Sequence, residues 1–148
     1  MAAPPGARAS TRAYHRAVHR LKTPLRWLLA LAMIAVGVTH FTAPLPFVRI
    51  VPPFIPWPEL AVAVSGAAEI AGGVGLLVPR TRRAAAWGLI ALYIAVFPAN
   101  IYMAVRHIQP GDTPVPAWAA WARLPFQAVF IAWAYWYAKR EPPARAAG

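Results

Sequence analysis

The chain has 148 residues, of which 59% are hydrophobic and only 13% charged, whereas a soluble domain carries about a quarter charged residues, so the composition excludes an ordinary water-soluble fold. The net charge of +11 does not indicate a nucleic-acid partner, because Lys and Arg stand between and outside the apolar runs rather than in a basic patch. The absence of cysteine excludes thiol catalysis, disulfide exchange and iron–sulfur clusters.

Residues 1–23 form a basic segment without a long apolar run. Its arginines recur at every fourth position: Arg8, Arg12, Arg16 and Arg20. On a helix they would repel one another, and anionic lipid head groups would relieve that repulsion, so an interfacial helix is predicted, with a disordered tail as the alternative. His15 and His19 are also four residues apart, but the flanking arginines disfavour a bound cation, and no metal site is predicted.

Residues 25–41 are the first predicted membrane span. A cleaved signal peptide is the alternative, but the run is long for one and no clean cleavage site follows it. Residues 42–58 hold six prolines, which predicts a rigid extended loop without helix. The apolar side chains of this loop are expected to fold onto the mouth of the bundle or the membrane interface. They are Phe47, Phe54, Ile55 and Trp57.

Three further apolar runs, at 59–78, 84–105 and 118–137, predict three more spans. The expected fold is therefore an all-α integral membrane protein, an up-down bundle of four transmembrane helices. Its membrane domain covers residues 24–138, and residues 139–148 form a short tail.

The distribution of Lys and Arg predicts the orientation of this bundle. Twelve of the 15 fall on the side of the termini and of the turn at residues 79–83, and three fall on the other side. Because cytoplasmic loops carry the excess of positive charge, both termini are predicted to be cytoplasmic.

Polar residues interrupt each span at membrane depth: His40, Ser65, Glu69, Asn100, Arg123 and Gln127. Because a helix rises about 1.5 Å per residue, all six are expected in the outer half or near the mid-plane of the bilayer. Such residues are costly in hydrocarbon and usually face the bundle interior. They predict one polar binding cluster that is open or nearly open to the outside.

Glu69 and Arg123 are the only opposite charges in this cluster, so an ion pair is expected between them, direct or through Gln127 or water. His40 could join as a hydrogen-bond partner or a proton carrier. The alternative is that the pair only fixes which helices pack together. For Asn100 and for Gln127, interhelical hydrogen bonding is the expected role.

Two backbone features accompany the cluster. Small residues on one face of the second span, including Gly66, Gly72 and Gly73, predict close approach of another helix. Pro98 is expected to kink the third span just before Asn100.

Six stretches are spread over residues 25–137: GVTHF (37–41), VPPFIPWP (51–58), SGAAEIAGGVGLLVP (65–79), AAWGLIAL (85–92), FPANIYMA (97–104) and RLPFQ (123–127). As a set they resemble motifs of the DoxX-like family of small bacterial membrane proteins. The resemblance implies a four-helix membrane bundle. It also marks five of the polar residues as positions inside the family's recurring motifs: His40, Glu69, Asn100, Arg123 and Gln127. The wider superfamily includes a small subunit of a thiosulfate–quinone oxidoreductase and proteins linked to oxidative-stress complexes.

The resemblance thus implies an accessory subunit of a redox system in the bacterial inner (cytoplasmic) membrane, with a quinone as ligand and a redox partner subunit. On this hypothesis the isolated chain is not an enzyme. The second hypothesis is a carrier or binder of a small solute or lipid, which would have to form a homo-oligomer because the chain is short for a transporter. The third is a structural assembly protein without a ligand.

Overall fold

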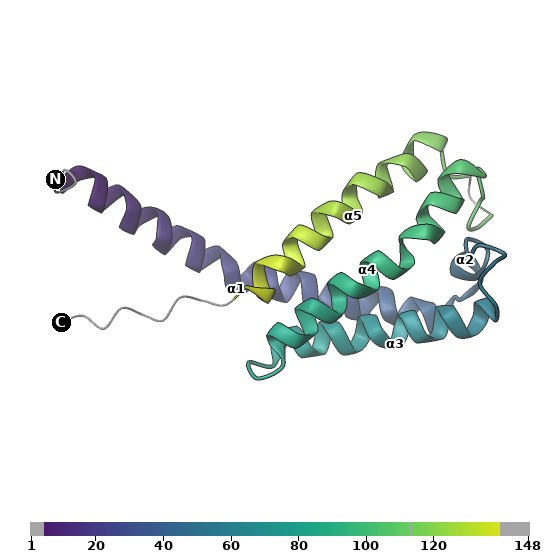
Figure 1. The fold of residues 1–148 in the computed structure, drawn as a ribbon, viewed down its shortest axis with the longest axis horizontal. Helices are drawn as coiled ribbons and strands as arrows, with labels where there is room; N and C mark the ends of the chain where they lie inside the picture. The colour runs from purple at the N-terminus through teal and green to yellow at the C-terminus, as the bar shows by residue number, and fades with distance from the viewer. Residues whose placement is uncertain (1–4, 113, 140–148) are drawn as a thin grey trace.

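A computed structural model of the chain describes residues 5–112 and 114–139, with side chains from residue 20 onward. Within these residues all regular structure is helical. The helices are α1 (Pro5–Thr42), α2 (Leu45–Val48), α3 (Pro58–Leu77), α4 (Arg82–Val105) and α5 (Ala117–Ala138) (Figure 1). The predicted tail from residue 140 onward lies outside the described residues.

Three helical segments are long and apolar enough to cross a membrane, namely Arg20–Thr42, Pro58–Leu77 and Arg82–Val105. This agrees with an all-helical, multi-pass membrane protein. The helix α5 has 22 residues, so it is long enough, but its mean hydropathy does not place it with these three segments. Its tryptophans and tyrosines, together with Arg123 and Gln127, lower its mean hydropathy.

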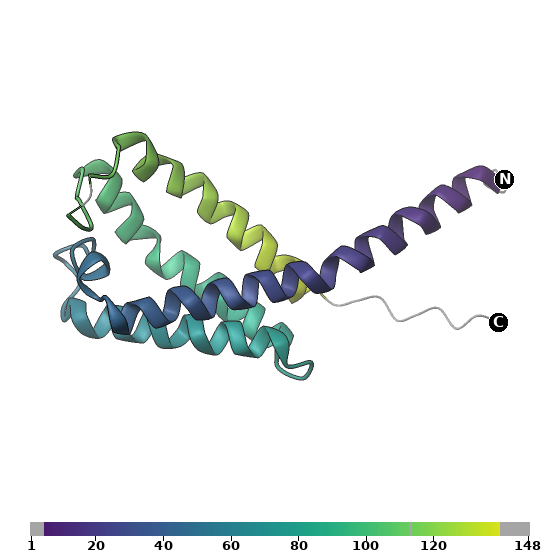
Figure 2. The ribbon, with the colours of Figure 1, turned by 180° about the vertical axis from the view of Figure 1, so that it is seen from behind.

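The basic segment and the first predicted span form a single helix, α1, which passes through Pro24 without a break. The disordered-tail alternative is therefore wrong from Pro5 onward. The N-terminal half of α1 projects beyond the bundle in both views (Figures 1 and 2).

The proline-rich loop contains one short helix, α2, so the prediction of no helix between residues 42 and 58 is wrong at Leu45–Val48. Pro44 and Pro46 stand at the start of this helix, where backbone N–H groups need no helical acceptor. The high proline content of this segment therefore excludes a long helix but not a single helical turn.

Glycines set how closely α1 and α3 approach each other, as the small residues of α3 predicted. A Cβ on Gly66 would lie 2.6 Å from the Cβ of His40, and a Cβ on Gly37 would lie 2.7 Å from the Gly66 carbonyl oxygen. Two turns along α3, a Cβ on Gly73 would lie 2.7 Å from the carbonyl oxygen of Ala30. The two helices are thus antiparallel and packed backbone to backbone along much of their length.

The four long helices pack in the order α1, α3, α4 and α5. All four contribute to one core cluster at the end where α3 turns into α4, which we call the turn end. Its fully buried members include Leu29, Leu76, Leu89 and Ala134. Toward the other end the α4–α5 pair diverges from the α1–α3 pair (Figures 1 and 2). The residues 43–57 and 106–112 lie at that end, and we call them the loop cover.

Candidate functional site

A cavity of about 400 Å³ lies between the diverging helix pairs, beneath the loop cover. Most of its wall is apolar, with side chains from α1, α3, α4 and residues 43–57. Five of the six polar residues singled out in the sequence line it: His40, Ser65, Glu69, Asn100 and Arg123. The chain fold therefore gathers these residues from four different helices into one place.

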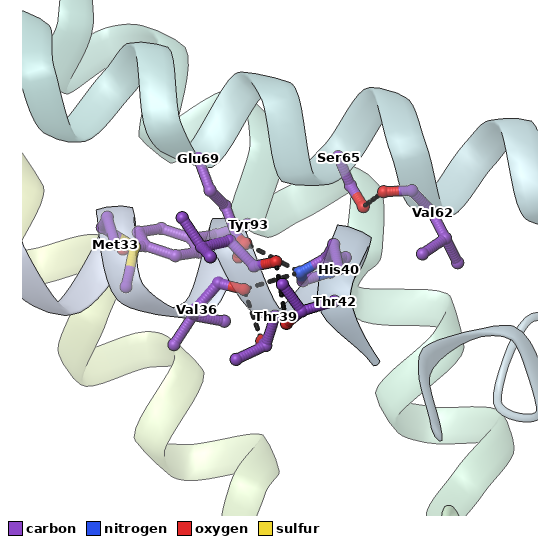
Figure 3. A network of polar contacts seen from close by, with 10 residues as sticks. Met33, Val36, Thr39, His40, Thr42, Val62, Ser65, Glu69 and Tyr93 are labelled. Atoms are coloured by element: carbon purple, nitrogen blue, oxygen red, sulfur yellow. Dashed lines mark hydrogen bonds and ion pairs between the residues drawn. The ribbon is translucent and has the colours of Figure 1, made fainter. Parts of the chain in front are cut away.

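The closest charged contact in the cavity joins α1 to α3. His40 Nδ1 lies 3.2 Å from Glu69 Oε2, and the two side chains are only 8% and 14% exposed. The same Nδ1 lies 3.0 Å from the Val36 carbonyl oxygen one turn back on α1 (Figure 3). A carbonyl oxygen only accepts, so Nδ1 carries a hydrogen that it donates to Val36, and Nε2 remains available to a ligand.

This arrangement leaves Glu69 incompletely satisfied. Although Oε2 is close to the imidazole, the contact lacks hydrogen-bond geometry, and within the described residues this buried oxygen accepts no hydrogen bond. A buried carboxylate oxygen without a donor is costly. The cavity beside Glu69 is therefore a place where a ligand donor or a water molecule would be stabilised.

The position of His40 depends on its neighbours on two sides. Its Cβ occupies the space that the missing side chain of Gly66 leaves open on α3. On the other side the Phe47 ring of α2 stacks on the imidazole, with centroids 3.8 Å apart and planes inclined by 23°. The proline-rich segment thus holds the histidine ring in place.

Gln127 does not line the cavity, but it is buried behind Asn100. Asn100 Nδ2 donates to Gln127 Oε1 at 2.8 Å, so both amides make interhelical hydrogen bonds, as expected, and the structure shows that they bond to each other. Gln127 Nε2 in turn donates to the carbonyl oxygen of Tyr93. Gln127 therefore joins α5 to α4 on both sides of Pro98, where α4 lacks one backbone donor.

The predicted direct ion pair between Glu69 and Arg123 is wrong. Both side chains line the cavity, but within the described part of the chain Glu69 pairs with His40 and Arg123 forms no ion pair. The physical reason is the α1–α3 contact, which brings the histidine against the carboxylate, while α5 diverges toward the loop cover. Arg123 remains an exposed cation at the edge of the cavity. Ser65 donates to the Val62 carbonyl oxygen of its own helix.

Two residues near the site were not singled out from the sequence. Phe47 was expected only to cover the bundle mouth, and its stacking on His40 follows from the turn made by α2. Tyr93 is buried and donates its hydroxyl to the sulfur of Met33 on α1, at 2.8 Å. A tyrosine in the middle of an apolar run is the signal that could have identified it. The side chains of His15 and His19 lie outside the described residues.

Fold and site together define a multi-pass helical membrane protein with a mostly apolar cavity between its helices, into which a few polar side chains project. Residues 29–138 match the family described as a domain of unknown function (DUF8561), and the chain belongs to that family. No curated protein and no solved structure gave a match. The resemblance to the DoxX-like family is not tested by these comparisons and stays a hypothesis.

Proposed function

We propose that this chain is an accessory subunit of a bacterial membrane redox system, and that its cavity binds a small amphipathic ligand of the quinone class. The observation that carries the proposal is the His40–Glu69 pair, which faces a cavity with mostly apolar walls. Ligand pockets typically combine such walls with a few placed polar groups. A polar residue kept at membrane depth is by default a functional candidate.

The chemistry of the pair suits a quinone head group. A quinone carbonyl accepts a hydrogen bond, and when bound a quinone supplies two-electron, two-proton redox chemistry. With its hydrogen on Nδ1, the neutral His40 ring accepts a hydrogen bond at Nε2 from the hydroxyl of the reduced ligand, the quinol, whereas only the imidazolium, with a second proton on Nε2, donates to a quinone carbonyl. The Glu69 carboxyl group lies beside the imidazole. The sequence has no cysteine, so neither a dithiol nor an iron–sulfur cluster of this chain can supply the electrons, and the proposal assigns that role to a partner subunit.

The proposed membrane arrangement has four spans with both termini in the cytoplasm. Support for the fourth span comes from α5, which packs against α4 and runs antiparallel to it. A helix of 22 residues is about 33 Å long, which is enough to cross the hydrocarbon core. The excess of Lys and Arg at the turn end supports the orientation in the bacterial inner membrane. In this arrangement the cavity lies in the outer half of the bilayer.

The test uses two glutamates of the same helix. Glu69→Gln keeps the size of the side chain and removes its charge in the cavity, whereas Glu59→Gln makes the same change at an exposed position in the first turn of α3. With decylubiquinone added to the purified protein in lipid nanodiscs, Glu69→Gln is expected to weaken binding at least several-fold and Glu59→Gln to leave it unchanged. Equal binding by both variants and the wild type would overturn the proposal.

One observation favours the second candidate, a carrier or binder of a lipid or small solute. Arg123 is an exposed cation at the cavity edge with no ion pair among the described residues, which suits an anionic head group. Binding of an anionic amphiphile such as oleate that is lost in Arg123→Gln, combined with no binding of decylubiquinone, would select this candidate.

The third candidate, an assembly protein, treats the His40–Glu69 contact only as a link between α1 and α3. It predicts that Glu69→Gln lowers the stability of the bundle while neither probe binds. The stability of each variant is therefore measured alongside binding.

A further inference from the structure

The loop cover closes the cavity at the end away from the turn end. The Nη1 of Arg49 donates to the Pro110 carbonyl oxygen at 3.4 Å and lies 3.9 Å from Asp112, which joins the two segments of the cover. Ile50 packs against a small core cluster made of Met103 and Ala104 on α4 and Ala120 on α5. Pro52 is fully buried. A path from water through this end would have to separate these contacts.

The flanks of the cavity are more open than its cover. Among the lining residues, Val36 on α1 is 38% exposed and Val64 on α3 is 60% exposed, and both stand within membrane-spanning segments. The lining residues of the cover are only partly exposed: Phe47, Ile50, Val51 and Ile55. In a bilayer the exposed flanks face hydrocarbon rather than water.

One flank is the gap between α1 and α5, where the cavity-lining residues Val36 and Arg123 are both exposed. These helices meet at the turn end, where the Tyr137 hydroxyl donates to the Lys22 carbonyl oxygen at 2.9 Å and Ala134 joins the core cluster with Leu29. Toward the cover, α5 follows α4 and separates from α1 (Figure 2). Val36 stands on the α1 side of the gap, and Arg123 is the α5 residue that lines the cavity.

We infer that the cavity takes its ligand sideways from the bilayer, through the gap between α1 and α5, and that the ligand is a membrane-dissolved amphiphile rather than a solute from water. Its polar head would lie at His40 and Glu69, and its apolar tail would pass Val36 into the lipid. A cavity of about 400 Å³ is near the lower end for ligand pockets, so it holds a head group but little of a long tail. This inference rests on the proposed function in that it assumes a ligand at the same site.

The route can be tested without any ligand because the chain has no cysteine. A bimane fluorophore attached to Ser65→Cys would report from inside the cavity. We expect lipids with a spin label on the acyl chain to quench it strongly and aqueous iodide to quench it weakly. Phe54→Cys on the exposed cover is the control for iodide, and Ile94→Cys, exposed on α4, is the control for lipid. Strong quenching by iodide with none from the lipid label would overturn the inference.

A second measurement uses the ligand and a matched pair of variants on α1. Val36→Trp narrows the gap, whereas Val38→Trp adds the same side chain at an exposed position that does not line the cavity. We expect Val36→Trp to slow association of decylubiquinone several-fold and Val38→Trp to leave the rate unchanged. If decylubiquinone still binds and its association rate is unchanged in both variants, the route is refuted. Failure of the wild type to bind the probe would refute the quinone proposal, and the quenching result would still decide the route.

Discussion

The contact between Gly66 and His40 gives a prediction that links stability to the site. In Gly66→Ala the new Cβ would lie 2.6 Å from the His40 Cβ and 3.0 Å from the Gly37 carbonyl oxygen. Carbon atoms pack about 3.5–4.0 Å apart, so α1 and α3 must separate by roughly 1 Å. Such overpacking costs about 1–3 kcal/mol.

The matched control is Gly88→Ala. Gly88 also lies within a helix, but no atom comes within 4 Å of the position of its added Cβ. Both changes gain up to about 1 kcal/mol of helix propensity, and this gain cancels when the two variants are compared. The difference between them, about 1–3 kcal/mol, therefore measures the overpacking.

The assay is reversible unfolding in mixed detergent and dodecyl sulfate micelles, followed by circular dichroism. We expect Gly66→Ala to unfold at a lower dodecyl sulfate fraction than Gly88→Ala, and also to bind decylubiquinone more weakly because His40 is displaced. If the two variants unfold at the same fraction, α1 and α3 are not packed backbone to backbone and the account of the site is wrong.

Three further predictions concern single contacts. A double-mutant cycle of Asn100→Ala and Gln127→Ala should give a coupling of about 0.6 kcal/mol in the same unfolding assay, the average for interhelical hydrogen bonds in membranes, and zero coupling would contradict the bond. Arg49→Ala should leave the unfolding midpoint unchanged, because its ion pair with the fully exposed Asp112 and its long hydrogen bond to the Pro110 carbonyl oxygen both lie in water; a clear loss would show that these contacts stabilise the fold. Tyr93→Phe should change stability by less than about 1 kcal/mol, because it keeps the buried ring and loses only a bond to a weak sulfur acceptor, whereas a larger loss would assign the hydroxyl another partner.

The sequence predicted the long helices well because apolar runs and prolines mark them directly. The second predicted span, 59–78, differs from α3 by one residue at each end. Local patterns were less informative where a contact between distant segments decides the outcome. Proline content could not predict the single turn of α2, and the basic repeat could not show that α1 continues through Pro24.

The site illustrates the same limit. The polar residues could be recognised individually because they interrupt apolar spans, but the partner of Glu69 was chosen by charge alone. His40 is its neighbour because Gly37 and Gly66 let α1 lie against α3. The pairing of Glu69 with His40 therefore depends on the register of α1 against α3. The small residues of these two helices were the sequence signal for that register.

The divergence of the helix pairs has a mechanical consequence. Gly72 packs against Leu89 at the turn end, which acts as the pivot of two stiff arms. Leu89 and Asn100 are eleven residues apart on α4, so the cavity stands roughly 16 Å from this pivot. At this distance, which follows from the helical rise per residue, a change of about 5° in the angle between the two helix pairs would move Asn100 by roughly 1.4 Å. A swing of α4 and α5 as a unit would therefore widen the cavity and would also disturb the loop cover, where Ile50 packs against Met103, Ala104 and Ala120.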